Sequence, residues 1–327
     1  MVFDTSLSAA RKVRMAASLI VAATLWATVV IAGLNEDLIR AAKLGNLSEV
    51  KGLIHQGANV NAKDGNGSTA LMLASQSGKL KVVKVLIDKG ADVNAKDIND
   101  ISALMIVSQN GQSDIAKVLL AKGAEINAVN KEGTTSLMLA SMNGRLEVVR
   151  ALLAKGADVN ARNNEGKTAL MMASMTIRCD VVKALLDQKA DVNAKSNDGQ
   201  TALMVAGKYG FPDLVQLLLD NNADVAARGK DGKTALMVAI TYRHPQAVRL
   251  LLDRNADVNA VDNDDQTALM LASKDGYSEL VQMLLAKKAA VNAKDKNGRT
   301  ALMLASQGGN DEVKKLLVQA GAEEFSP

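Results

Sequence analysis

The sequence predicts an all-α solenoid, a row of stacked helix-turn-helix repeats with projecting loops. A six-residue motif, Thr-Ala-Leu-Met-Val-Ala at Thr201, has close relatives that begin at Thr69, Ser102, Thr135, Thr168, Thr234, Thr267 and Thr300. Neighbouring copies always lie 33 residues apart, and a polar relative begins one period further upstream, at Glu36. Eight copies and this relative make nine 33-residue repeats in the chain of 327 residues.

Each repeat has the sequence features of two short helices and a loop. Thr69 suits a helix N-cap, because its hydroxyl can accept a hydrogen bond from a free N–H of the first turn. The apolar residues after it favour a helix that ends near Gly78, and a second apolar run, Leu80 to Ile87, stops before Gly90. The polar segment that follows has turn residues. A single unit of this kind cannot bury its apolar face, so the repeats must stack.

The period and the motif resemble those of the ankyrin repeat family. Supporting motifs are Gly-Ala-Asp-Val-Asn-Ala at Gly90 and Gly156 and Asp-Gly-Lys-Thr-Ala-Leu at Asp231, and the resemblance extends from Asn35 to Ala322. In the full copies, Met replaces the His of the family motif Thr-Pro-Leu-His, and Ala replaces its Pro except in the copy that carries Ser136. The resemblance implies a non-enzymatic scaffold that binds another protein through its concave face and its loop tips.

The first 33 residues differ from the repeats and predict a signal peptide or a signal anchor. Arg11, Lys12 and Arg14 precede an uncharged, mostly apolar run, the pattern of an export signal, and cleavage after Ala32 is compatible with it. The run is also long enough to span a bilayer, so residues 15–34 are an alternative membrane anchor. Both alternatives place the repeats outside the cytoplasm, in a periplasmic or secreted location or tethered to the outer face of the membrane.

Residues 34–327 are predicted to form one repeat domain with a polar cap at each end. The N-terminal cap repeat is assigned to residues 34–65, seven repeats to 66–296, and the C-terminal cap repeat to 297–327. Glu36 and Asp37 are expected to open the first helix, where negative charge favours the N-terminal end of the helix dipole. Polar outer faces on terminal repeats keep a solenoid soluble.

Composition and residue spacing argue against several other functions. Cys179 is the single cysteine, which excludes an intramolecular disulfide and a zinc site built from several thiolates. The formal net charge of +4 is not concentrated in a basic stripe, so nucleic-acid binding is not favoured. His55 and His244 lie more than five repeats apart, and His244 is expected to be a solvated turn residue. We therefore expect no catalytic residue, no cofactor and no resident metal.

A row of methionines follows the capping residues at the position of the family's His. Thioethers suit Cu(I), so a soft-metal or small-ligand binder that uses exposed methionines is an alternative function. Packed helices lie about 8–10 Å apart, however, and equivalent sulfur atoms at that separation cannot share one ion. We expect these side chains to fill the space between repeats. The row consists of Met72, Met105, Met138, Met171, Met204, Met237, Met270 and Met303.

The candidate partner-binding surface lies in the middle of the array. At the seventh and eighth positions after the capping residue, the terminal repeats carry polar residues, whereas the middle repeats carry Met142, Met175, Lys208, Tyr209 and Tyr242. Tyr is enriched at protein interfaces, and Met suits adaptable ones. These five residues and Arg243 form the predicted partner-binding patch. The alternative is neutral drift in the irregular repeats five to seven.

The same repeats break the usual turn pattern. Ile177 and Arg243 replace the Gly that closes the first helix in most other repeats. Because a β-branched residue resists a left-handed conformation, we expect the turn at Ile177 to rearrange. Lys189, Asn222 and Asn255 replace the Gly after the second helix, where Asn tolerates that conformation better than Lys.

Overall fold

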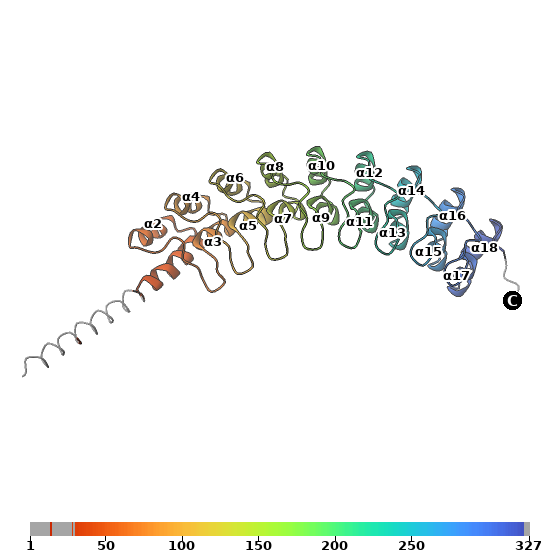
Figure 1. Cartoon of the computed structure of the whole chain (residues 1–327), viewed down its shortest axis with the longest axis horizontal. Coiled ribbons are helices and arrows are strands. Elements are labelled where there is room, and N and C mark those ends of the chain that lie inside the picture. The colour runs from red at the N-terminus through yellow and green to blue at the C-terminus, as the bar shows by residue number, and fades with distance from the viewer. Residues whose placement is uncertain (1–13, 15–27, 29, 324–327) are drawn as a thin grey trace, which may run out of the picture. The chain divides into compact units, whose positions relative to one another are not determined.

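The computed structural model describes residues 14, 28 and 30–323 (Figure 1). The predicted signal peptide or anchor, residues 1–33, lies outside this part of the chain except for residues 14, 28 and 30–33. Within the described residues, no helix has both the length and the apolar character needed to cross a membrane.

The chain forms two compact units, residues 1–126 and 127–327, and both are built from pairs of short helices joined to loops. The described part of the first unit contains a helix over residues 30–44, then α2 (Leu47–His55), α3 (Ala70–Gln76), α4 (Leu80–Asp88), α5 (Ala103–Asn110) and α6 (Ser113–Ala121). Its β structure is limited to isolated bridges at the loop bases, such as the one between Lys63 and Thr69.

The second unit continues the same alternation of first and second helices. The first helices of its repeats are α7 (Ser136–Met142), α9 (Ala169–Met175), α11 (Ala202–Tyr209), α13 (Ala235–Thr241), α15 (Ala268–Lys274) and α17 (Ala301–Gln307). The second helices are α8 (Leu146–Ala154), α10 (Cys179–Asp187), α12 (Pro212–Asp220), α14 (Pro245–Asp253), α16 (Ser278–Ala286) and α18 (Asp311–Gln319). The predicted all-α helical repeat solenoid is confirmed.

The capping residue of the motif begins every first helix from α3 to α17. The hydroxyl of Thr69 accepts a hydrogen bond from the backbone N–H of Met72 at 3.3 Å, and the seven later copies repeat this bond at 3.3–3.4 Å. The bond satisfies a backbone donor that the helix itself leaves free. Each first helix therefore starts at a fixed residue, which sets the register of the whole repeat.

The methionine after each cap lies in the core between neighbouring helices. Seven of the eight are at most 3% exposed, and Met303 of the last repeat is half-buried. The packing role agrees with this burial. Within their own repeats, the Sδ atoms of Met72 and Met270 also accept the backbone N–H of Thr69 and Thr267 at 3.4 Å.

Asparagines in the loops connect consecutive repeats within each unit. Each accepts, through Oδ1, the backbone N–H of the residue 31 positions later, at 2.7–3.0 Å; they are Asn61, Asn94, Asn127, Asn160, Asn193, Asn259 and Asn292. Ala226 occupies the equivalent position in the sixth repeat and has no side-chain oxygen with which to accept this bond. Repeats six and seven keep the bond from the Arg228 guanidinium to the Val261 carbonyl, and other repeats form the equivalent bond from Lys63, Arg162 and Lys195.

The polar ends of the repeat array differ in part from the prediction. Residues 30–44 are helical, so Glu36 and Asp37 lie inside the first helix and not at its N-terminal end. Asp37 instead pairs with Arg40 at 2.6 Å, one turn away. At the other end, α18 begins with Asp311, which pairs with Lys314 at 2.6 Å and gives this terminal helix a polar start.

The turns that lack Gly keep the same geometry as the others, which makes the predicted rearrangement wrong. Ile177 and Arg243 have φ values of 60° and 62°, so both adopt the left-handed conformation. Beyond Ile177 the backbone N–H of Arg178 still bonds to the Ala173 carbonyl at 3.0 Å. Lys189, Asn222 and Asn255 are left-handed as well, as is Lys288. The hydrogen bonds and packing of the repeat outweigh the local backbone strain.

A second constraint acts on the Gly of the first turn, because a side chain of the next repeat lies against it. A Cβ atom on Gly210 would lie 2.1 Å from Nδ1 of His244, and one on Gly144 would lie 2.5 Å from Cδ of Arg178. Both side chains come from the residue 34 positions later. At the two turns that lack Gly, that residue is aromatic, namely Phe211 and Tyr277. The exceptions to the turn pattern therefore coincide with a change in the residue that faces the turn.

Replacing Ile177 with Gly should stabilise the protein by about 1 kcal/mol. The left-handed conformation costs an L-residue about 1–2 kcal/mol, and the greater freedom of Gly in the unfolded chain offsets part of this gain. The measurement is the midpoint of urea unfolding, with Asn222→Gly as the control, since Asn tolerates the conformation and should change little. A lower midpoint for Ile177→Gly would show that the side chain stabilises the turn more than the backbone strain costs.

Candidate binding surface on the loop–helix face

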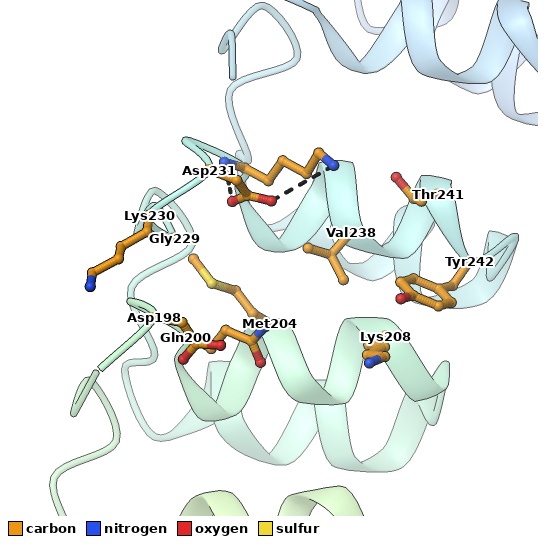
Figure 2. Close-up of a pocket in the computed structure, with 11 residues that line it drawn as sticks. Asp198, Gln200, Met204, Lys208, Gly229, Lys230, Asp231, Val238, Thr241 and Tyr242 are labelled. Atoms are coloured by element: carbon orange, nitrogen blue, oxygen red, sulfur yellow. Dashed lines mark hydrogen bonds and ion pairs between the residues drawn. The ribbon is translucent and has the colours of Figure 1, made fainter. Parts of the chain in front are cut away.

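The exposed ends of the first helices and the projecting loops form one face of the repeats, here called the loop–helix face. In the second unit this face contains two neighbouring cavities. The larger, of about 310 Å³, lies between α11 and α13, and the smaller, of about 220 Å³, involves α9 and α11. Figure 2 shows the larger one, where Val238 of α13 and Tyr242, directly after α13, face Met204 and Lys208 of α11.

Three residues line both cavities and so form the ridge between them: Asp198 and Gln200 from the loop, and Lys208 near the end of α11. The Lys208 Nζ atom lies 5.3 Å from the centroid of the Tyr242 ring and 5.8 Å from that of Tyr209. An ammonium group at this range is attracted to the ring face. The two tyrosines, Tyr209 from the same repeat and Tyr242 from the next, therefore hold the lysine between the cavities.

Lys208 is also the basic residue that carries an unneutralised charge on this ridge. Lys233 pairs with Asp231 at 3.7 Å, and Lys167 pairs with Glu165 at 2.5 Å. Among the described residues, Lys208 has no carboxylate within ion-pair distance, and its contacts are the aromatic rings. The hydroxyl of Ser196 donates a hydrogen bond to Asp198, which partly satisfies the one carboxylate on the ridge.

The main chain under Lys208 is fixed by His244 of the next repeat. The His244 ring is half-buried, and its Nε2 atom lies 3.0 Å from the Lys208 carbonyl. Since a carbonyl only accepts, Nε2 must donate, which fixes the proton on that nitrogen. The expectation that His244 is a solvated turn residue is therefore wrong. This bond orients the end of α11, where Lys208 and Tyr209 project.

A second cation–aromatic pair lies one repeat further along. The Arg243 guanidinium carbon is 3.9 Å from the centroid of the Tyr277 ring. Burial raises the pKa of the Tyr277 hydroxyl, and the Asp275 carboxylate raises it further, while Arg243 acts in the opposite direction. Tyr277 therefore stays neutral at physiological pH and presents its ring to the guanidinium.

The structure brings four of the six predicted patch residues together around the cavities. Tyr242 lines the larger cavity, Met175 and Tyr209 line the smaller one, and Lys208 lines both. Met142, at the end of α7, and Arg243 line neither cavity, although both side chains are exposed. The predicted patch therefore has a centre at Lys208 and two outlying members.

The walls of the cavities include residues that sequence analysis did not place in the patch. Met204 and Val238 provide apolar surface in the larger cavity, and Asp198 provides the acidic group on the ridge. Met204 was assigned to the core, where it is indeed 3% exposed, yet part of its side chain reaches the cavity. Val205 and Val238 could have been assigned to this face from the sequence. They lie 33 residues apart, so they occupy equivalent positions in successive repeats.

The loop-tip residues of this face are largely engaged within their own loops. Lys167 and Lys233 form the ion pairs described above, and Arg299 pairs with Asp295 at 2.8 Å. The Arg299 hydrogen bonds lower the pKa of Asp295 although burial opposes them. Among the described residues, no group of three or more His, Cys, Asp or Glu side chains is arranged to hold a metal ion.

A comparison with known families and proteins identifies the family to which this architecture belongs. A family model described as ankyrin repeats (3 copies) matches residues 38–130, 104–196, 178–262 and 256–325, which together cover most of the chain. A search among curated proteins gave no match. With the capped first helices, the paired helices and the 33-residue period, the chain belongs to the ankyrin repeat family.

Proposed function

We propose that this protein is a non-enzymatic scaffold that binds another protein through its loop–helix face. Ankyrin repeats generally mediate protein–protein interaction, which supports the general assignment. We place the centre of the binding surface at Lys208, Tyr209 and Tyr242, with Met175 beside them and Met142 and Arg243 at its edges.

The observation that carries this proposal is the group of exposed aromatic and methionine side chains on a mostly polar face. Tyr209 is 38% exposed, Tyr242 is 48% exposed and Met142 is 37% exposed. Only 2% of the residues in the chain are aromatic, yet two tyrosines in adjacent repeats are exposed side by side. Exposed apolar groups that lie together mark interaction sites, because their contact with water is unfavourable. Interfaces are enriched in Tyr, Met and Arg, the residue types gathered here.

The soft-metal alternative receives less support from the structure. The methionine row on which it relied is buried in seven of its eight positions, and the Met142 and Met175 side chains belong to successive repeats. A buried thioether is not available to an incoming ion without local opening. We therefore retain protein binding as the proposed function of the exposed methionines.

We also propose that the repeats act outside the cytoplasm. The basic residues Arg11, Lys12 and Arg14 and the apolar run after them support export. Cleavage and membrane anchoring predict different products. Mass spectrometry of the protein purified from its native cell should find either a mature N-terminus near Gly33 or an intact N-terminus in the membrane fraction. Full-length protein in the cytosolic fraction would contradict export.

The partner-binding patch is tested by the double substitution Tyr209→Ala/Tyr242→Ala. If these rings are central contacts, the substitution should weaken binding of a captured partner roughly 100-fold, since central Tyr residues each contribute about 1–2 kcal/mol or more. The measurement is crosslinking and capture with the full-length chain, quantified by mass spectrometry.

The control for that experiment is Gln76→Ala/Ser77→Ala, which changes the seventh and eighth positions after the capping residue of the second repeat; Ser77 is the equivalent of Tyr209 and Tyr242. This variant should capture the same partner as the wild type. Circular dichroism should show equal helicity for all three proteins. Equal capture by the tyrosine variant would move the binding surface away from Lys208.

A further inference from the structure

We propose that the ridge at Lys208 recognises an acidic, extended segment of the partner protein. A carboxylate of that segment binds Lys208, and two apolar side chains that flank the carboxylate enter the two cavities. This inference rests on the proposed function, because it assigns a partner chemistry to the same surface.

The first step of the argument is the position of Lys208 relative to the cavities. Lys208 lines the 310 Å³ cavity and the 220 Å³ cavity, so a ligand that fills both must pass over its side chain. The tyrosine rings on its two sides, at 5.3 and 5.8 Å from Nζ, favour a restricted set of ammonium positions. A pre-positioned cation loses less side-chain entropy when it binds an anion.

The second step is charge. Among the described residues, Lys208 and Lys230 form no ion pair, whereas Lys233 and Lys167 are neutralised by neighbouring carboxylates. Lys230 is exposed and also lines the larger cavity. The acidic group on the ridge, Asp198, accepts a hydrogen bond from Ser196. The unneutralised side chains around the ridge are thus mostly cationic, which favours an acidic ligand.

The third step is the apolar part of the cavity walls, which lies beside charged residues such as Lys230, Asp231 and Lys167. Met204, Val238 and Tyr242 contribute to the larger cavity, and Met171, Met175 and Val205 contribute to the smaller one. Cavities of this size hold one or two side chains each, and the apolar part of each wall gains most from contact with an apolar side chain. A purely anionic ligand would leave both cavities unfilled.

The fourth step is spacing. Neighbouring packed helices lie about 8–10 Å apart, and equivalent cavities in successive repeats share that separation. A chain in the polyproline II conformation advances about 3.1 Å per residue with three residues per turn, so side chains three positions apart lie about 9 Å apart on the same side and can reach the two cavities. The recognised segment therefore has two apolar residues three positions apart, with Asp or Glu between them above Lys208.

The experiment is selection from a phage-displayed library of random 12-residue peptides on the immobilised full-length protein. Wild-type protein should enrich sequences with Asp or Glu between two apolar residues three positions apart. The Lys208→Glu variant should instead enrich Lys or Arg at the central position. Synthetic versions of the enriched acidic peptides should bind Lys208→Gln about three- to tenfold more weakly, and binding should weaken with added salt.

The matched control is Lys274→Gln, since Lys274 is exposed and occupies the Lys208 position two repeats later. It should leave peptide affinity unchanged. Enrichment without an acidic preference, the same preference in Lys208→Glu, or no enrichment at all would overturn the proposal.

The outcomes also separate this proposal from the broader one. If Tyr209→Ala/Tyr242→Ala abolishes partner capture while Lys208→Glu leaves peptide selection unchanged, the surface is correct and the partner chemistry is wrong. If the tyrosine variant retains its partner and the library still selects acidic peptides on wild type alone, Lys208 binds acidic peptides, but the captured partner uses another surface.

Discussion

The structure depends on one constraint: a single repeat has too little apolar surface of its own to form a core, so each repeat must cover its neighbour. The motif residues show this directly, since Ala70, Leu71 and Met72 are each 1% exposed although they belong to a helix of seven residues. So short a helix is unstable alone, and its stability comes from packing. The capping hydroxyl then fixes where each helix begins, which keeps the neighbouring faces in register.

A strict period has a direct consequence for function. Residues 33 positions apart occupy equivalent places on successive repeats, so a surface can be built from single substitutions in adjacent copies. Tyr209 and Tyr242 are such a pair, and Lys208 lies between their rings. His244 supports the same place from behind through the Lys208 carbonyl. The family's repeat period builds the scaffold, and Tyr209 and Tyr242 differ from the residues at the same position in the other repeats of this chain.

The repeat boundaries, the caps and the helix ends could be predicted because they depend on local rules that the sequence repeats many times. The first turn of α12 and of α14 begins with Pro212 and Pro245, as the fixed φ of Pro favours. The turn at Ile177 was predicted wrongly, because the local preference of one residue was weighed without the packing that holds the turn. His244 was misjudged for a related reason, since its acceptor lies in the preceding repeat.

The candidate site was predictable only in part. Exposure of Met142, Tyr209 and Tyr242 follows from helical periodicity, so these residues could be found from the sequence. The cavities could not, because they depend on how the loop that carries Asp198 and Gln200 folds over α11. Lys208 lies on the ridge because this loop borders both cavities. The replacement of asparagine by Ala226 is visible in the sequence. That it removes a hydrogen bond between repeats is known only from the bonds that the other asparagines form in the structure.

The most direct test of the stacking account is to remove one whole period and compare it with the removal of half a period. Deletion of residues 267–299 joins Gln266 to Thr300 and keeps the motif in register. The account predicts that this protein keeps its helicity per residue and a cooperative urea transition, because each repeat depends only on its neighbours. Deletion of residues 267–283 breaks the register and should abolish cooperative folding of the surrounding repeats. An equal loss of helicity and of cooperative unfolding in both deletion variants would contradict the account.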